Sequence, residues 1–167
     1  MSGILKRLLK ASGIPQQGVG LLWEGHSIAS LKGIDQPLLD AIYSLGHQNY
    51  QSERFVEARK IMRYLCVHDH RNAEYLAALG ACEYRLGNYA AALGVLEQSV
   101  SMNPSDPRSL LNLALCLIKS GRKKEARAAM RVAEGLARDQ TAFRYEWKLA
   151  SRILEGRGKQ KQSRSED

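Results

Sequence analysis

The chain has 167 residues, 44% of them hydrophobic and 25% charged, and its formal net charge at pH 7 is +8. It contains no run of 18 apolar residues, and basic residues interrupt its first short apolar run, which excludes a membrane-spanning helix and does not fit a secretory signal. We therefore expect a cytoplasmic protein. Its three cysteines lack a Cys-x-x-Cys spacing, which favours buried free thiols over disulfides or metal ligands.

The first 36 residues predict a short helical segment and no separate domain. Residues 2–11 alternate apolar and basic positions as in an amphipathic helix, which is too short to be stable alone. Its apolar face needs either the rest of the chain or a second copy, so residues 1–36 are a candidate dimerisation segment. Trp23 lies in a second short segment, residues 21–31, as a predicted packing residue, and Asp35 is a predicted helix N-cap.

Between Pro37 and about Gln140 the sequence repeats every 34 residues. Four positions recur in register: Ile42, Leu76 and Leu110; Leu45, Leu79 and Leu113; Gly46, Gly80 and Ala114; and Ala58, Ala92 and Ala126. Small residues at two of these positions suit a pair of antiparallel helices that cross at close distance. The spacing predicts helix pairs over 37–51 with 54–68, 73–86 with 89–102, and 107–120 with 123–137.

Turn residues separate the two helices of each predicted pair. Gly87 and Gly121 stand where a helix can end in a left-handed residue. The first copy has Glu53 at this place, so we expect Ser52 or its neighbours to make that turn. Beyond the third pair, residues 141–154 predict a closing helix that covers the open end with side chains such as Trp147.

A period of 34 residues with small residues at these positions resembles the tetratricopeptide repeat. The resemblance predicts an all-α fold, a helix-pair solenoid with three such repeats. The expected organisation is an N-terminal helical or dimerisation segment over 1–36, three tetratricopeptide repeats over 37–140, a capping helix over 141–155 and a disordered basic tail over 156–167. The tail is expected to be disordered because it lacks apolar residues.

The positive charge is concentrated late in the chain. Residues 107–140 carry eight basic and three acidic side chains, whereas residues 39–106 carry six and eight. The third repeat contains the basic cluster Arg122, Lys123, Lys124, Arg127 and Arg131. Because no aromatic residues are interleaved there, we interpret the cluster as the solvated face of a helix and do not predict nucleic-acid binding.

No constellation of residues indicates catalysis. His68, Asp69 and His70 are the closest approach to one, but residues two apart do not share a helix face, and the run falls at a predicted helix end. The sequence has no glycine-rich phosphate loop, nucleophile elbow or His-Glu-x-x-His motif. We therefore predict no enzymatic activity, no metal and no cofactor.

The predicted architecture offers a groove, because the first helix of each stacked pair lines the inner side. Helical spacing places nine residues there: Tyr43, His47 and Tyr50; Ala77, Ala81 and Tyr84; and Leu111, Leu115 and Ile118. Apolar and aromatic surface along a trough suits an extended peptide. The residues of the third copy either line the trough or pack under the closing helix, whereas the tyrosines offer flat area and a hydroxyl group for a ligand.

Several runs resemble a particular family, the class II chaperones of bacterial type III secretion systems, of the SycD, LcrH and IpgC type. The runs are GHSIASLKGI, IYSLGHQNYQ, LCVHDHRNAEY, LGACEYRLGNY and DPRSLLNLALCLIKSGR, within about residues 24–138. The resemblance implies three tetratricopeptide repeats, an N-terminal segment often used in dimerisation, and a groove that takes an extended segment of a hydrophobic translocator.

The same resemblance implies groove roles for Tyr43, His47 and Tyr50, with His68 and His70 from the end of the first repeat. The chain departs from the family at His47, where an aromatic is preferred, and in its basic charge. The leading hypothesis is therefore a non-enzymatic cytoplasmic chaperone that binds an apolar segment of a hydrophobic secreted translocator, as a candidate homodimer through residues 1–36. The alternative is a tetratricopeptide-repeat adaptor or regulatory scaffold that binds a partner protein.

Overall fold

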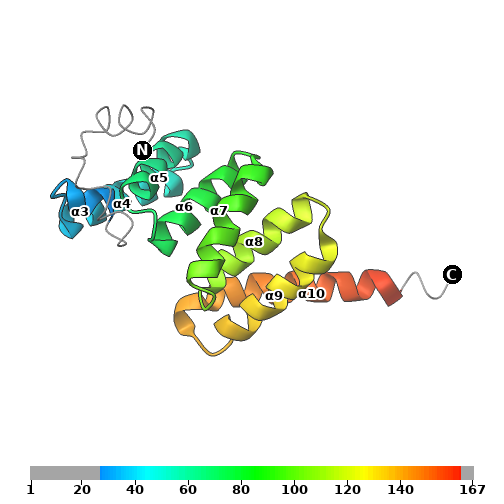
Figure 1. Cartoon of the computed structure of the whole chain (residues 1–167). Coiled ribbons are helices and arrows are strands. Elements are labelled where there is room, and N and C mark those ends of the chain that lie inside the picture. Colours follow the sequence, from blue (N-terminus) through cyan, green and yellow to red (C-terminus); the bar gives the residue numbers. More distant parts are fainter. Residues whose placement is uncertain (1–26, 163–167) are drawn as a thin grey trace, which may run out of the picture.

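The computed structural model describes residues 27–162, and every regular element in that range is a helix (Figure 1). The bounds are α3 Ile28–Leu31, α4 Gln36–Gln51, α5 Phe55–His68, α6 Ala73–Arg85, α7 Tyr89–Met102, α8 Pro107–Lys119, α9 Lys123–Ala137, η1 Thr141–Phe143 and α10 Arg144–Gln162. The predicted all-α fold is confirmed. The predicted helix over residues 2–11 and Trp23 lie outside the described residues.

The helices pack as antiparallel pairs that stack in chain order (Figure 1). Helix α4 packs on α5, α6 on α7 and α8 on α9, and the second helix of each pair also packs on the first helix of the next. Buried side chains gather between α3, α4, α5 and α6, between α7, α8 and α9, and between α8, α9 and α10. The three predicted helix pairs are confirmed, and their core runs along the stack.

The recurring small residues lie where the two helices of a pair touch. A Cβ atom added at Gly46 would lie 2.6 Å from Met62 Cε, and one added at Gly80 would lie 2.4 Å from Leu96 Cγ. In the third pair Ala114 is completely buried. A small side chain is therefore needed at this position so that the two helices can approach closely. This requirement is the physical reason that a small residue recurs there every 34 residues.

The turn between the helices has the same geometry in all three pairs. Gly87 and Gly121 have φ angles of +80° and +79°, and Glu53 occupies the equivalent place with a φ of +60°. The turn of the first pair is thus made by Glu53 itself, a left-handed residue without the freedom of glycine. Its carboxylate lies 3.7 Å from the Arg85 guanidinium, so it has a partner in the next repeat.

The first helix of each pair begins with a side-chain cap. The Asp35 carboxylate accepts a hydrogen bond from Leu38 N at 3.2 Å, which confirms the predicted N-cap. Asn72 and Asp106 cap α6 and α8 in the same way. The caps satisfy backbone amides that have no partner inside the helix, so they define where each inner helix starts.

Helix α10 closes the stack by packing on α8 and α9. Ala150 is completely buried, and Leu149, Ile153 and Leu154 pack against the core formed with α8 and α9. The helix continues to Gln162. Its last residues include arginine, lysine and glutamine, which are good helix formers.

The surface of α9 agrees with its predicted polarity. Ala126, Met130 and Ala133 are buried, and Arg127 and Arg131 are exposed. The basic cluster therefore lies on the solvent side of this helix. Within residues 27–162 no helix is long and apolar enough to cross a membrane.

The three cysteines are free thiols, as the sequence predicted. Cys82 and Cys116 are completely buried, and Cys66 is half-buried. Burial raises the pKa of Cys82 and of Cys116 to about 11, and that of Cys66 to about 12. Because the thiolate is the reactive form, these thiols are inert at neutral pH.

Candidate functional site

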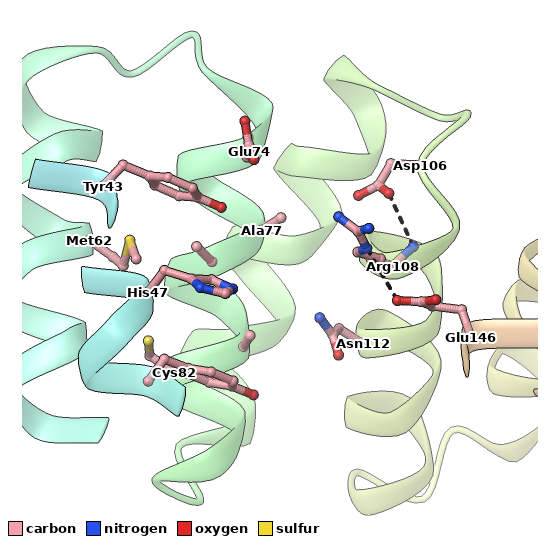
Figure 2. Close-up of a pocket in the computed structure, with 13 residues that line it drawn as sticks. Tyr43, His47, Met62, Glu74, Ala77, Cys82, Asp106, Arg108, Asn112 and Glu146 are labelled. Atoms are coloured by element: carbon pink, nitrogen blue, oxygen red, sulfur yellow. Dashed lines mark hydrogen bonds and ion pairs between the residues drawn. The ribbon is translucent and has the colours of Figure 1, made fainter. Parts of the chain in front are cut away.

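A cavity of about 490 Å³ lies on the inner side of the stack, between α4, α6 and α8 (Figure 2). Its lining comes from Tyr43, His47 and Tyr50 of α4, Met62 of α5, Glu74, Ala77, Ala78, Ala81 and Cys82 of α6, Asp106, Arg108 and Asn112 at and after the start of α8, and Glu146 of α10. Most of these residues belong to first helices of the repeats. The inner side of the stack is therefore the side that offers a binding site.

The wall formed by α4 is aromatic. Tyr43, His47 and Tyr50 follow one another at helical spacing and so lie on one face of α4. The Tyr43 ring lies 5.5 Å from the Tyr75 ring, and the Tyr50 ring lies 5.3 Å from the Phe55 ring. These neighbours hold the tyrosines in place before any ligand arrives, which lowers the entropic cost of binding.

Small side chains of α6 form the floor of the cavity. Ala77 and Ala81 stand 34 residues after Tyr43 and His47, so they occupy the equivalent places of the second repeat. The cavity exists because the second repeat has alanine where the first has two rings. This difference between equivalent positions leaves room for large apolar side chains of a ligand.

The opposite wall, from α8 and α10, is polar. Arg108 Nε lies 3.2 Å from Glu146 Oε1, and the Arg108 guanidinium carbon lies 4.9 Å from the centre of the Phe143 ring (Figure 2). Asn112 lies one turn after Arg108 and also faces the cavity. The capping helix thus reaches the groove through Glu146 and closes one side of it.

Sequence reasoning missed the residues of this polar wall. Asn112 is the one polar residue within the run Leu110–Ile118, and a polar residue inside an apolar helix is a signal for a site. Arg108 and Glu146 gave no comparable signal, because their pairing spans 38 positions. Only the packing of α10 on α8 brings them together.

Six of the predicted residues lie outside the cavity lining. His68 is buried in α5, with Nδ1 2.9 Å from Tyr64 O and its ring stacked on that of Tyr64, and His70 is exposed in the following turn. Tyr84 packs on the buried cluster between α7, α8 and α9, and its ring lies beside that of Tyr89. Leu111, Leu115 and Ile118 belong to the core cluster that α8 forms with α9 and α10, which favours the interpretation that they pack under the closing helix.

The tyrosine hydroxyls are hydrogen-bond donors at neutral pH. Burial raises the pKa of Tyr43, and the neighbouring Glu74 carboxylate raises it further. Burial also raises the pKa of Tyr50, although Arg85 acts in the opposite direction. A ligand therefore meets an apolar ring surface with neutral hydroxyl groups. Among residues 27–154 no three metal-ligating side chains gather, so the described groove offers no metal site.

The fold and the groove define the class: a tetratricopeptide-repeat protein with a cavity on its inner side. The family model for the tetratricopeptide repeat matches residues 43–107 and 78–142.

Comparison with individual proteins identifies a narrower family within this class. Low calcium response locus protein H of Yersinia pestis is 33% identical over 129 residues, which are 77% of this chain and 75% of the relative. The Yersinia enterocolitica type III secretion translocator chaperone SycD superposes with a TM-score of 0.72 at 31% identity, covering 79% of this chain and 98% of SycD.

PcrH in complex with the chaperone binding region of PopD superposes with a TM-score of 0.71 at 32% identity. This match covers 77% of this chain and 97% of PcrH. The chain therefore belongs to the family of type III secretion translocator chaperones that includes low calcium response locus protein H and SycD.

Proposed function

We propose that this chain binds an extended apolar segment of a hydrophobic translocator in the cavity between α4, α6 and α8. The observation that carries the proposal is the aromatic wall of Tyr43, His47 and Tyr50 opposite a floor of alanines, in a chain of this family. The structure of the relative PcrH with the chaperone binding region of PopD supports a client of this kind. The role is non-enzymatic, and its place is the bacterial cytoplasm.

Binding of this kind keeps the client soluble and ready for export. An apolar translocator segment left in water would aggregate or enter a membrane, because burying apolar surface stabilises either outcome. In the cavity, the two tyrosines cover such a segment with flat apolar area at little entropic cost.

Co-expression tests the chaperone role. A translocator of the same secretion system is produced with and without this chain, and the fraction of translocator in the soluble extract is measured. We expect most of the translocator to be soluble only with the chain present. Equal solubility in both cases would contradict the proposal, and a stable complex with a folded protein would favour the adaptor alternative.

Variants of the groove test the assignment of the site. Tyr43→Ala combined with Tyr50→Ala removes the aromatic wall, and we expect it to abolish the gain in solubility. Tyr64→Ala is the matched control, because Tyr64 is 42% exposed on α5 and does not line the cavity. If both variants solubilised the translocator as well as the unmodified chain, the groove assignment would be wrong.

A further inference from the structure

The groove does not end at the aromatic wall. A second hollow of about 320 Å³ adjoins the cavity, lined by Ala73, Glu74, Asn103, Ser105, Asp106, Arg108, Ser109 and Phe143. Glu74, Asp106 and Arg108 line both spaces. Figure 2 shows Glu74 and Asp106 at one end of the cavity, away from Cys82 and Asn112. A segment that leaves the apolar cavity at this end passes over charged side chains.

The charges at this junction are not balanced. The Arg108 guanidinium is held by Glu146 at 3.2 Å and by the face of the Phe143 ring. The Asp106 carboxylate accepts hydrogen bonds from Arg108 N at 3.2 Å and Ser109 N at 3.1 Å, as the cap of α8. No ion pair within the described part of the chain occupies the Glu74 carboxylate, which is exposed.

The surroundings of Glu74 suit a cation from outside. The neighbouring Tyr43 hydroxyl donates a hydrogen bond to the Glu74 carboxylate, which keeps its negative charge, and the face of the Tyr43 ring also attracts a cation. The three carboxylates that line the cavity, those of Glu74, Asp106 and Glu146, outnumber its one arginine. This local excess is negative, although the whole chain has a net charge of +8.

We propose that this end of the groove is a subsite for a positively charged client residue, a lysine or arginine that flanks the apolar segment. The inference rests on the proposed function and names the chemistry of one end of that site. The aliphatic part of the client side chain lies along the Tyr43 ring, and its charged end reaches the Glu74 carboxylate. The pairing of Arg108 with Glu146 reduces the repulsion between Arg108 and the arriving cation.

Peptides that differ at one flank test the subsite. The probes share an apolar core taken from the chaperone binding region of PopD and carry lysine, glutamine or glutamate at one end or the other. Their affinity is measured by fluorescence polarisation with the full chain. We expect the lysine peptide to bind about fivefold tighter than the glutamine peptide at one of the two ends, the size of a partly exposed ion pair. The preference disappears at 1 M salt, where screening acts within about 3 Å.

A pair of variants assigns the effect to Glu74. Glu74→Gln keeps the shape of the side chain and should make the lysine and glutamine peptides bind equally tightly. Glu57→Gln is the matched control, because Glu57 is also an exposed acidic residue in the first turn of a helix but lies outside the groove. It should keep the full preference.

The outcomes separate the subsite from the proposed function. Equal binding of the lysine and glutamine peptides by the unmodified chain would overturn the subsite while the apolar groove stands. A lysine preference that survives in Glu74→Gln would also overturn it. If none of the peptides bound, the groove assignment itself would fail, and the subsite with it.

Discussion

The first and third repeats carry large side chains at equivalent positions of their inner helices and use them differently. Tyr43 and His47 of the first repeat line an open cavity, whereas Leu111 and Leu115, 68 positions later, pack with α10. The backbone is the same helix pair in both. The difference shows that the capping helix covers part of the inner side of the third repeat.

A second pair of equivalent positions differs in exposure because of what precedes each repeat in the stack. Leu45 of the first repeat is 52% exposed, whereas Leu113 of the third is 9% exposed. The leucine of the third repeat is covered because another helix pair precedes it. Residues 27–34 supply only the short helix α3 before the first pair, so the same residue type is left uncovered by the described chain.

The largest expected effect is on stability, at Leu111. Leu111→Ala removes a side chain that is 3% exposed and packed with α10, and we expect it to lower the free energy of unfolding by about 3 kcal/mol. Tyr43→Ala, at the equivalent position of the first repeat, should lower it less because the side chain faces a cavity. Urea denaturation followed by circular dichroism measures both. Equal losses would remove the distinction between the two repeats.

The next effect is on binding. Tyr43→Ala with Tyr50→Ala should weaken the affinity for a translocator segment by about 2 kcal/mol, roughly thirtyfold, as truncated aromatic anchors usually do. Leu115→Ala, in the third repeat, should leave this affinity nearly unchanged after correction for stability. Isothermal titration calorimetry measures the two dissociation constants. An unchanged affinity in the double tyrosine variant would show that the first repeat is not the binding surface.

A third effect separates the repeats by pH. The second and third repeats each carry a buried cysteine, Cys82 and Cys116, where the first has Gln48. Folding raises both thiol pKa values from 9.0 to about 11, so their contribution to stability is complete below pH 9 and is lost as the pH rises through 11. Replacing both by alanine should flatten the loss of stability between pH 9 and 11. Urea midpoints measured across that range check this, and an unchanged slope would contradict it.

The smallest effect concerns the contact of α10 with the groove. Glu146→Gln breaks the ion pair with Arg108, whose side chain is 57% exposed, and we expect a loss of about 0.5 kcal/mol of stability. Thermal unfolding at low and high salt measures it, and the difference between the two proteins should shrink at high salt. A loss of several kcal/mol would mean that this pair anchors the capping helix, which the packing of Ala150 and Leu149 makes unnecessary.

Particular residues show how far sequence reasoning reached. Tyr43, His47 and Tyr50 were predicted to line one trough with Ala77 and Ala81, and the structure brings these five together. Helical spacing suffices for that, because it decides which side chains share a face. The same rule leaves the place of Leu111 undecided, since sharing the inner face does not show whether another element covers that face.

The sequence by itself determined the helix pairs, their register and their turns, because each depends on residues close along the chain. Gly80 must be small where two neighbouring helices cross, and Gly87 stands where the helix ends in a left-handed residue. Only the tertiary structure decided which inner positions remain open and which charges meet, as Arg108 meets Glu146. The physical reason is that these contacts join segments far apart in the chain, and their spacing along the sequence carries no periodic signal.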